Sequence, residues 1–292
     1  MKLINSKVEL IPQFDLFKHI ELAGRTCYKS EDKITDDSAS AFVGRIINSK
    51  HLSVLEHGTV YLTYHLDKEE TGDFDPYKYI HNPYSRVNIV NNEDGSNDFY
   101  ITTNYRVIVE NNWEADMRYQ TEPSSKHIAR YTFRFTCSRA IANEIVRHRV
   151  MSFSQESQRY CNYNKDKFGN TITYIIPEQF NKLPMGDYIY WDGDWCDAAN
   201  TKVLVDHTNP DFEPISAYLS ALDTCELMYF KLIKQGVKPQ VARDVLPNAT
   251  KTEIVVTGFE SDWDHFLALR DNPAAHPDIQ KLAKSVRKLL NK

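Results

Sequence analysis

Apolar residues recur every three or four positions along several segments of the chain, which is the spacing of helices that bury one face. The segments with this spacing are residues 14–30, 36–50, 138–150, 214–237, 238–247, 262–270 and 277–292. Ser138 stands where a helix N-cap is expected, and Gly236 and Pro247 stand where helices are expected to end. The pattern therefore predicts helices near both ends of the chain and at its middle.

Other segments have the composition and the two-residue alternation of β-strands. These segments are residues 7–13, 58–66, 130–136 and 251–259, with shorter runs within residues 100–110 and 171–180. We expect residues 58–66 and 130–136 to line one sheet. The acidic and aromatic residues 186–197 read as irregular surface.

This mixture of helices and strands indicates an α/β (α+β) fold, with a central and mostly antiparallel sheet flanked by helices. Residues 67–112 are rich in Asn, Asp, Pro and Tyr, and they read as an inserted surface excursion. No repeat, heptad or low-complexity tract is present. A single domain over residues 1–292 therefore explains the pattern more economically than two domains.

The net charge argues against a general binder of polyanions. The 292 residues carry a formal net charge of -5, whereas nucleic-acid-binding domains usually have a basic surplus. We therefore expect no nucleic-acid partner, and any cationic site must be local.

The spacing of the cysteines and the lack of long apolar runs indicate the cellular compartment. The five cysteines are odd in number, widely spaced and free of any CxxC pair, so they suggest neither a disulfide framework nor a zinc site. They are Cys27, Cys137, Cys161, Cys196 and Cys225. The amino terminus has no apolar core before a cleavage site, and no run of eighteen apolar residues occurs. We expect a cytoplasmic protein with no membrane contact and no metal site.

Anion-binding side chains are concentrated in one segment, residues 147–160, whose sequence is RHRVMSFSQESQRY. Guanidinium groups hold a phosphate dianion best when hydroxyl and backbone N–H donors stand beside them. The chain contains neither GxGxxG nor GxxxxGK[ST], so side chains are the expected phosphate ligands. The alternative interpretation is a solvated helical face, which would pair arginines with glutamates more regularly than this segment does.

Two further arginines occupy unusual positions. Arg243 lies among apolar residues of a helix that Pro247 is expected to end, and Arg270 follows His265 and Phe266 by about one helical turn. Arginines at helix ends commonly do no more than complement the helix dipole. Both are nevertheless candidates to hold the same anion as residues 147–160.

Residues 147–160 resemble the signature segment of a known family. Arg147, His148 and Arg149, followed after seven residues by Ser157, resemble the RHR-x7-S signature of the flavin-dependent thymidylate synthases. Four further stretches fall in the order typical of that family: AGRTCY at 23–28, HLSVLEH at 51–57, ARDVLP at 242–247, and HFLALR with AAHPDIQKLA between 265 and 284. The resemblance covers most of the chain except about 67–129 and 185–210, which look like insertions relative to shorter members.

The resemblance implies a homotetramer whose active sites form between subunits and bind FAD, NADPH, dUMP and 5,10-methylenetetrahydrofolate, with dTMP as the product. In that family the reduced flavin supplies the hydride, so no catalytic cysteine is needed. The flavin-binding residues that it implies are His51, Ser53, Glu56, Arg147, His148, Arg149 and His265. The dUMP-binding residues that it implies are Arg147, Gln155, Ser157, Arg159, Arg243 and Arg270. Arg270, as the group that polarises the uracil ring, and Ser157, as a hydrogen-bond donor, are the two expected to act in catalysis.

Several residues depart from the family's pattern. Glu144 stands where a Gln often helps to hold the phosphate, and a carboxylate there repels phosphate unless it is turned away or paired. Phe259 and Ser261 replace an Asn and an Arg often found along the adenine half of FAD, and stacking on Phe259 is the expected substitute. Cys27 reads as a packing residue near the flavin rather than as a nucleophile.

Two other functions stay open on the sequence alone. The first is a different flavin-dependent modification at C5 of a pyrimidine nucleotide, such as hydroxymethylation, which the mass of the product distinguishes from methylation. The second is a non-catalytic nucleotide- or RNA-binding protein, which would show neither flavin absorbance nor reductase activity.

Overall fold

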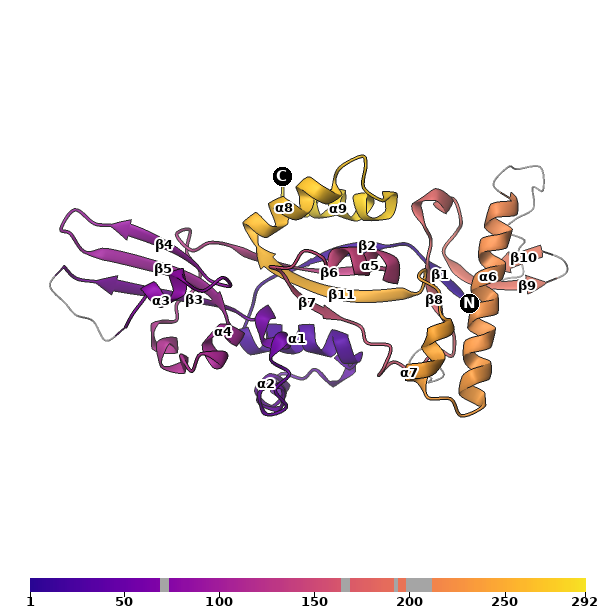
Figure 1. Ribbon diagram of the computed structural model, residues 1–292, viewed down its shortest axis with the longest axis horizontal. Helices are drawn as coiled ribbons and strands as arrows, with labels where there is room; N and C mark the ends of the chain where they lie inside the picture. The colour runs from indigo at the N-terminus through magenta and orange to yellow at the C-terminus, as the bar shows by residue number, and fades with distance from the viewer. Residues whose placement is uncertain (69–73, 164–168, 192–193, 198–211) are drawn as a thin grey trace.

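The computed structural model arranges three β-sheets in a row along the long axis of the molecule (Figure 1). The residues that the structure describes are 1–68, 74–163, 169–191, 194–197 and 212–292. The middle sheet lies between two layers of helices, and one smaller sheet extends from each end of it. No helix within these ranges is both long enough and apolar enough to cross a lipid bilayer.

The central sheet has the strand order β2-β6-β11-β7, and every neighbouring pair is antiparallel. Its strands are β2 (Lys7–Ile11), β6 (Arg130–Ser138), β11 (Lys251–Phe259) and β7 (Ser152–Gln155). β6 and β11 pair over their full length, from Lys251 against Ser138 to Phe259 against Arg130. The prediction of a central antiparallel sheet is confirmed.

Helices cover both faces of this sheet (Figure 1). One layer contains the helices α1 (Leu16–Tyr28) and α2 (Ser38–Asn48). The short turn η1 (Glu31–Lys33) connects them, and the turn η2 (Leu52–His57) follows α2. The other contains α5 (Arg139–Ile145), α8 (Glu260–Arg270) and α9 (Pro277–Leu289). All five helices lie where the apolar spacing predicts them.

The main core lies between the central sheet and α5, α8 and α9. Alternate residues of β11, such as Ile254 and Val256, face this layer together with Phe133 of β6 and Trp263 of α8, and all four are fully buried. Burying a large apolar side chain contributes about 1.5–3 kcal/mol, so this layer is the main support for the residues that follow α5.

A second sheet of three strands, in the order β3-β5-β4, lies at one end of the molecule (Figure 1). Its elements, with the helices beside it, are β3 (Thr59–Leu66), α3 (Tyr77–Ile80), β4 (Arg86–Asn91), β5 (Asn97–Asn104), α4 (Tyr105–Glu110) and η3 (Glu114–Tyr119). The expectation that residues 58–66 and 130–136 line one sheet is wrong. Both edges of β6 are already occupied, by β2 and by β11, so β3 pairs with β5 instead.

The end of this sheet also corrects a strand prediction. Residues 100–104 are β-strand as expected, but the apolar run after them forms α4. The side chain of Asn104 accepts a hydrogen bond of 3.1 Å from the Val107 backbone N–H, which caps the first turn of the helix. A capping residue therefore changes the strand into a helix within a run that reads as β-like.

A third sheet, in the order β10-β9-β1-β8, lies at the opposite end beside a long helix (Figure 1). Its elements are β1 (Lys2–Ile4), β8 (Thr173–Ile175), η5 (Glu178–Phe180), β9 (Gly186–Trp191), β10 (Asp194–Asp197) and the helix α6 (Phe212–Lys234). The expectation of irregular surface at 186–197 is wrong, because β9 and β10 pair as an antiparallel hairpin. The rest of the predicted insertion, residues 198–210, lies outside the described residues.

The connection from α6 back to β11 is short. Gly236 has a φ of +84°, which ends the helix, and the chain continues through α7 (Pro239–Ala242) and the turn η6 (Arg243–Val245). Arg243 therefore lies at the end of the molecule that contains α6. The helical segment formed by α7 and η6 ends before Pro247, as the sequence predicts.

Candidate active site

Residues 147–160 form a corner and then an edge strand of the central sheet. The Ser138 hydroxyl accepts a hydrogen bond of 3.3 Å from the Ile141 N–H and caps α5, as predicted. α5 ends at Ile145, the chain turns through the RHR residues, and it enters β7, which pairs with β11. This turn places the cationic residues beside α8.

The RHR residues and α8 line a common cavity of about 420 Å³, which we call the RHR pocket. Its lining residues are Arg147, His148, Arg149, Val150, Met151, Asp262, His265, Leu269 and Arg270. Five of the residues that the sequence assigns to a flavin or nucleotide site thus meet here, although 116 positions separate Arg149 from His265 in the sequence.

Arg270 is held in place by three hydrogen bonds. Its Nη1 donates to the carboxylate of Glu144 at 2.8 Å, its Nη2 to the Glu144 carbonyl at 3.2 Å, and its Nε to Nε2 of His148 at 3.1 Å. Glu144 is therefore paired, which removes the repulsion of phosphate expected from an isolated carboxylate at that position. The guanidinium is a fixed charge rather than a mobile one.

His148 is a neutral ring in this arrangement. Burial, the charge of Arg270 and the neighbouring His265 together lower the pKa of His148 to about 4. Because a guanidinium can only donate, Nε2 of His148 must accept the bond from Arg270, so the proton of the neutral ring lies on Nδ1. His148 can therefore donate one hydrogen bond through Nδ1.

Arg147 and Arg149 are the free cations of the RHR pocket. Both are exposed, and neither forms an ion pair with any carboxylate in the described ranges. The one carboxylate in the lining, Asp262, accepts a hydrogen bond of 2.8 Å from the Phe259 N–H at the start of α8. Val150 and Leu269 leave apolar surface exposed beside these charges, and each is 50% exposed.

A second cavity of about 430 Å³ lies along β7 and η2, and we call it the β7 pocket. Its lining residues are Cys27, Tyr28, Lys50, His51, Leu52, Ser53, Val54, Arg106, Glu110, Phe153, Ser154 and Gln155. The Tyr28 hydroxyl and Nδ1 of His51 lie 3.3 Å apart, and the rings of Tyr28 and Tyr160 lie 5.1 Å apart. The amide of Gln155 donates to the Thr252 hydroxyl at 3.3 Å.

Glu56 is paired with an arginine that the sequence did not point to. Its carboxylate accepts a hydrogen bond of 2.5 Å from Arg106, and Arg106 also binds Glu110 through two bonds of 2.7 and 2.9 Å. Arg106 lies on α4, within the predicted insertion and outside every motif. No sequence signal identified this pair.

Ser157 is fixed by its backbone and has no base beside it. Its N–H donates to the Cys27 carbonyl at 3.0 Å, and its hydroxyl accepts from the Arg159 N–H at 3.4 Å. Within the described part of the chain, no histidine forms a hydrogen bond with that hydroxyl. Burial raises the pKa of the Cys27 thiol, so neither side chain is an activated nucleophile.

A network of buried charges holds the segment between Gln155 and Ser157. Glu156 is 2% exposed, and its carboxylate accepts from Lys251 at 2.9 Å. Lys251 also binds Glu253 at 2.6 Å, and Glu253 binds Lys29 at 2.6 Å. The network joins β7, β11 and the end of α1, and no sequence motif predicted it.

Phe259 and Arg243, two residues that the sequence analysis singled out, line neither pocket. Phe259 is only 3% exposed, with the guanidinium groups of Arg86 and Arg130 lying 4.7 and 5.3 Å from its ring centre. Its ring is therefore covered, and stacking of an adenine on Phe259 is not available. Arg243 lines neither pocket, and its nearest acid is Asp244 at 4.0 Å.

Within one chain the predicted residues do not all meet. Five line the RHR pocket and three line the β7 pocket, whereas Glu56, Ser157, Arg159 and Arg243 line neither. The RHR pocket and the β7 pocket have no lining residue in common, and β7 begins directly after the last residues of the RHR pocket. No group of three or more His, Cys, Asp or Glu side chains suited to a metal ion occurs among the described residues.

Comparison with known proteins places most of the chain in one family. The family described as thymidylate synthase complementing protein matches residues 114–292. The flavin-dependent thymidylate synthase of Mycobacterium avium (strain 104) is 26% identical over 266 residues, which covers 90% of this chain and 71% of that protein. The protein of the same name from Geobacter sulfurreducens is 29% identical over 153 residues, or 52% of each chain.

Among solved structures, the chain is similar to a UMP/dUMP methylase, PolB from Streptomyces cacaoi, bound with 5-Br dUMP. The TM-score is 0.43 at 17% sequence identity, covering 99% of this chain and 92% of that one.

Proposed function

Because the chain belongs to the thymidylate synthase complementing protein family, we propose that it catalyses the reductive methylation of dUMP to dTMP. In this proposal methylenetetrahydrofolate donates the carbon, and FAD with NADPH supplies the hydride. The chain is an enzyme of the methyltransferase class. The observation that carries the proposal is the convergence of Arg147, His148, Arg149, His265 and Arg270 on one pocket within the matched region.

The side chains of the RHR pocket fit a flavin. Arg147 and Arg149 have no counter-ion in the described ranges and can meet the diphosphate of FAD. The exposed faces of Val150 and Leu269 can meet a planar ring system. His51 and Ser53, in the β7 pocket, are the other residues proposed to hold the flavin.

Bound flavin supplies the hydride chemistry, which no side chain of a protein can provide by itself. Arg270 lies at a fixed position because Glu144 and His148 take three of its N–H groups, and its remaining N–H groups are free to stabilise negative charge on the uracil ring. His148 keeps its proton on Nδ1, where it can donate a hydrogen bond without itself becoming charged.

Ser157 and Arg159 are proposed to hold dUMP. The Ser157 hydroxyl has no neighbouring base among the described residues, which favours a role as hydrogen-bond donor to the nucleotide over a role as nucleophile. Gln155 lies two positions earlier on β7, and we propose that it contacts the same nucleotide. The buried pair of Glu156 with Lys251 keeps these side chains at fixed positions along the strand.

We also propose that the complete site forms between subunits of a homotetramer. On one chain the RHR pocket and the β7 pocket share no lining residue, and Arg243 lines neither of them. Assembly would bring the RHR pocket of one subunit to the β7 pocket of another. Mixing Arg243→Ala chains with Ser157→Ala chains should then restore part of the activity after subunit exchange. Confirmed exchange with no gain over the parent variants would refute shared sites.

A stopped-flow assay of flavin reduction tests the proposed reaction. Purified protein with FAD should be reduced by NADPH faster when dUMP is present, and the full mixture should yield a product with the mass of dTMP. A product heavier by one oxygen would instead indicate hydroxymethylation. The double variant Arg147→Ala/Arg149→Ala should lose FAD affinity, measured by flavin fluorescence, whereas Lys284→Ala on the exposed side of α9 should not. Absence of any flavin binding by the wild-type protein would reject the proposal.

A further inference from the structure

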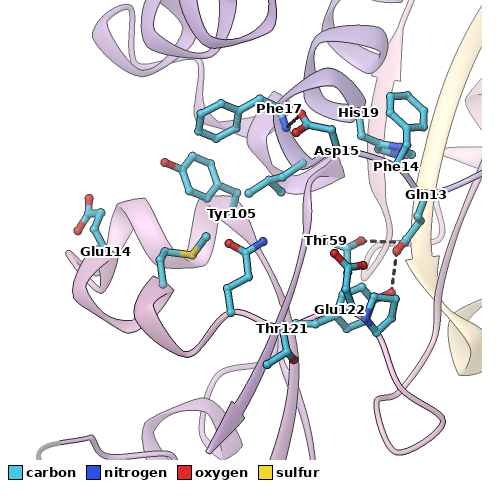
Figure 2. A pocket seen from close by; sticks show the side chains of 15 residues that line it. Gln13, Phe14, Asp15, Phe17, His19, Thr59, Tyr105, Glu114, Thr121 and Glu122 are labelled. Carbon is cyan, nitrogen blue, oxygen red and sulfur yellow. Dashed lines mark hydrogen bonds between the residues drawn. The ribbon is translucent and has the colours of Figure 1, made fainter.

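A third cavity, of about 630 Å³, lies between the central sheet and the β3-β5-β4 sheet, and we call it the inter-sheet pocket (Figure 2). Its walls come from the segment that leads into α1, from the start of β3, and from the region between α4 and residue 123. None of the residues assigned above to flavin or dUMP lines it. Its size is within the range of pockets that bind small molecules.

The base of this pocket is held by fixed hydrogen bonds. The Gln13 amide donates to the Thr59 hydroxyl and to the Arg130 carbonyl, both at 2.9 Å, and it accepts from the Tyr61 hydroxyl at 2.7 Å. Figure 2 shows the bond between Gln13 and Thr59 at one side of the cavity. The pocket is therefore already formed, because these bonds tie the N-terminal segment to β3 and to β6.

His19 presents an unpaired nitrogen at the wall. The side chain is 3% exposed, and Nε2 lies 3.0 Å from the Thr132 hydroxyl, which in turn lies 2.8 Å from that of Thr257. Nδ1 is buried and has no hydrogen-bond partner among the described residues. Burial, followed by the charge of Arg130, lowers the pKa of His19 to about 4, so the ring is neutral. When Nε2 donates to Thr132, Nδ1 is a bare acceptor that lacks an N–H donor.

The charged side chains that line the pocket are all acidic, although the buried Arg130 lies behind Thr59. Asp15, Glu114 and Glu122 are among its lining residues, and no Lys or Arg is. Within the described ranges, Glu114 and Glu122 form no ion pair, and Figure 2 shows them on opposite sides of the cavity. Such a site disfavours phosphate esters and favours a cation.

Aromatic rings form the remaining wall. Phe17 and Tyr105 meet edge to face with their ring centres 5.3 Å apart, and Figure 2 shows both at one side of the pocket. Phe14 is 45% exposed, and its ring centre lies 5.2 Å from that of His19. Exposed aromatic faces beside carboxylates attract flat cations, through the ring quadrupole as well as through charge.

We propose that the inter-sheet pocket binds a small, planar aromatic cation with N–H donors. Its ring lies against Phe14, Phe17 and Tyr105, and its charge is balanced by Glu114 and Glu122. This site is separate from the proposed reaction and does not depend on it, because it contains none of the residues assigned to that reaction.

Three probes of the same shape and different charge test the proposal: benzamidine, which is a cation, benzamide, which is neutral, and benzoate, which is an anion. Calorimetric titration of the wild-type protein should show binding of benzamidine, weaker binding of benzamide and none of benzoate. Raising the salt concentration should weaken the binding of benzamidine, since exposed charge pairs are screened. Equal affinity for benzamidine and benzamide would refute the role of the carboxylates.

Exposed variants locate the site without disturbing the core. The double variant Glu114→Gln/Glu122→Gln should raise the Kd for benzamidine about tenfold, the combined effect expected of two solvent-facing charge pairs. Glu213→Gln, at the exposed start of α6, removes the same kind of charge far from the pocket and should leave the Kd unchanged. Equal effects of both changes would show that benzamidine responds only to net charge. A crystal soaked with benzamidine should show its ring between Phe14 and Tyr105, and density only elsewhere would overturn the proposal.

Discussion

Replacing Lys251 by methionine should destabilise the protein more than the loss of any exposed charge. The Lys251 ammonium lies 2.9 Å from Glu156 and 2.6 Å from Glu253, and its side chain is 17% exposed. Glu253 keeps Lys29 at 2.6 Å in the variant, but Glu156, at 2% exposure, loses its cation. Removing one partner of a buried ion pair typically costs about 3–5 kcal/mol, because the other charge stays buried and unpaired.

The pKa of Glu253 gives an upper limit for the part of this effect that passes through Glu253, because Lys29 stays in the variant. Burial alone would raise this pKa, but Lys251 and Lys29 together lower it from 4.5 to about 2. Since one pKa unit corresponds to about 1.4 kcal/mol, this fall is worth about 3 kcal/mol of stability at neutral pH. A carboxyl group with a lowered pKa stabilises the fold above the pKa of the unfolded chain, near 4.5, and this contribution is lost as the pH falls towards 2. The difference between wild type and Lys251→Met should therefore be largest above pH 4.5 and shrink below it.

Urea denaturation followed by circular dichroism measures this difference, and thermal unfolding at pH 7 should show a midpoint lower by about 5–8 °C. Lys7→Met is the matched control, because Lys7 is 60% exposed and, among the described residues, forms an ion pair with Glu9 alone, at 3.2 Å. That control should change the free energy of unfolding by less than about 1 kcal/mol. If Lys251→Met falls within 1 kcal/mol of the control, or if its effect does not depend on pH, the buried network does not stabilise the fold as argued.

Three further predictions concern the proposed site and the layer beneath it. Arg270→Ala should reduce kcat about a hundredfold or more while changing the affinity for dUMP less, and equal losses in steady-state and binding measurements would reassign Arg270 to binding alone. Ser157→Ala should weaken dUMP binding by about 1.5–3 kcal/mol yet still form dTMP, and mass spectrometry that finds a covalent adduct of wild-type Ser157 would contradict this. Gly24→Ala should destabilise the protein by about 1–3 kcal/mol, because the added Cβ would lie 2.6 Å from Phe42, whereas Gly44→Ala in the same layer meets no atom within 4 Å and should not, as thermal melting can show.

The elements of the fold were predictable wherever a local pattern decides them. Helix spacing and caps are properties of neighbouring residues, so α5 begins after Ser138 and α6 ends before Gly236 as expected. Strand partners are not local. Residues 58–66 and 130–136 alternate in the same way, and only the occupied edges of β6 separate them into two sheets.

In the candidate site, too, the residues that belong to local motifs were predictable and those held by distant partners were not. The motifs named Arg147, His148 and Arg270 as site residues, because all three belong to stretches with a recognisable order, and all three line the RHR pocket. They could not identify Arg106 or Lys251, because their partners Glu56 and Glu156 lie 50 and 95 positions away and no spacing rule connects them. Ion pairs of this kind depend on the tertiary arrangement, which a single sequence does not display.

The order of strands in the central sheet also sets the order in which the chain can fold. β3, β5 and β4 all lie between Thr59 and Asn104, so this sheet can form from local contacts soon after it is synthesised. Among the strands that the structure describes, β7 in contrast pairs with β11 alone, and the last residue of β11 is Phe259. During synthesis, β7 therefore has no partner strand until nearly the whole chain has emerged from the ribosome. We therefore expect a nascent chain that is truncated before β11 to lack an ordered β7, and with it the residues proposed to hold dUMP.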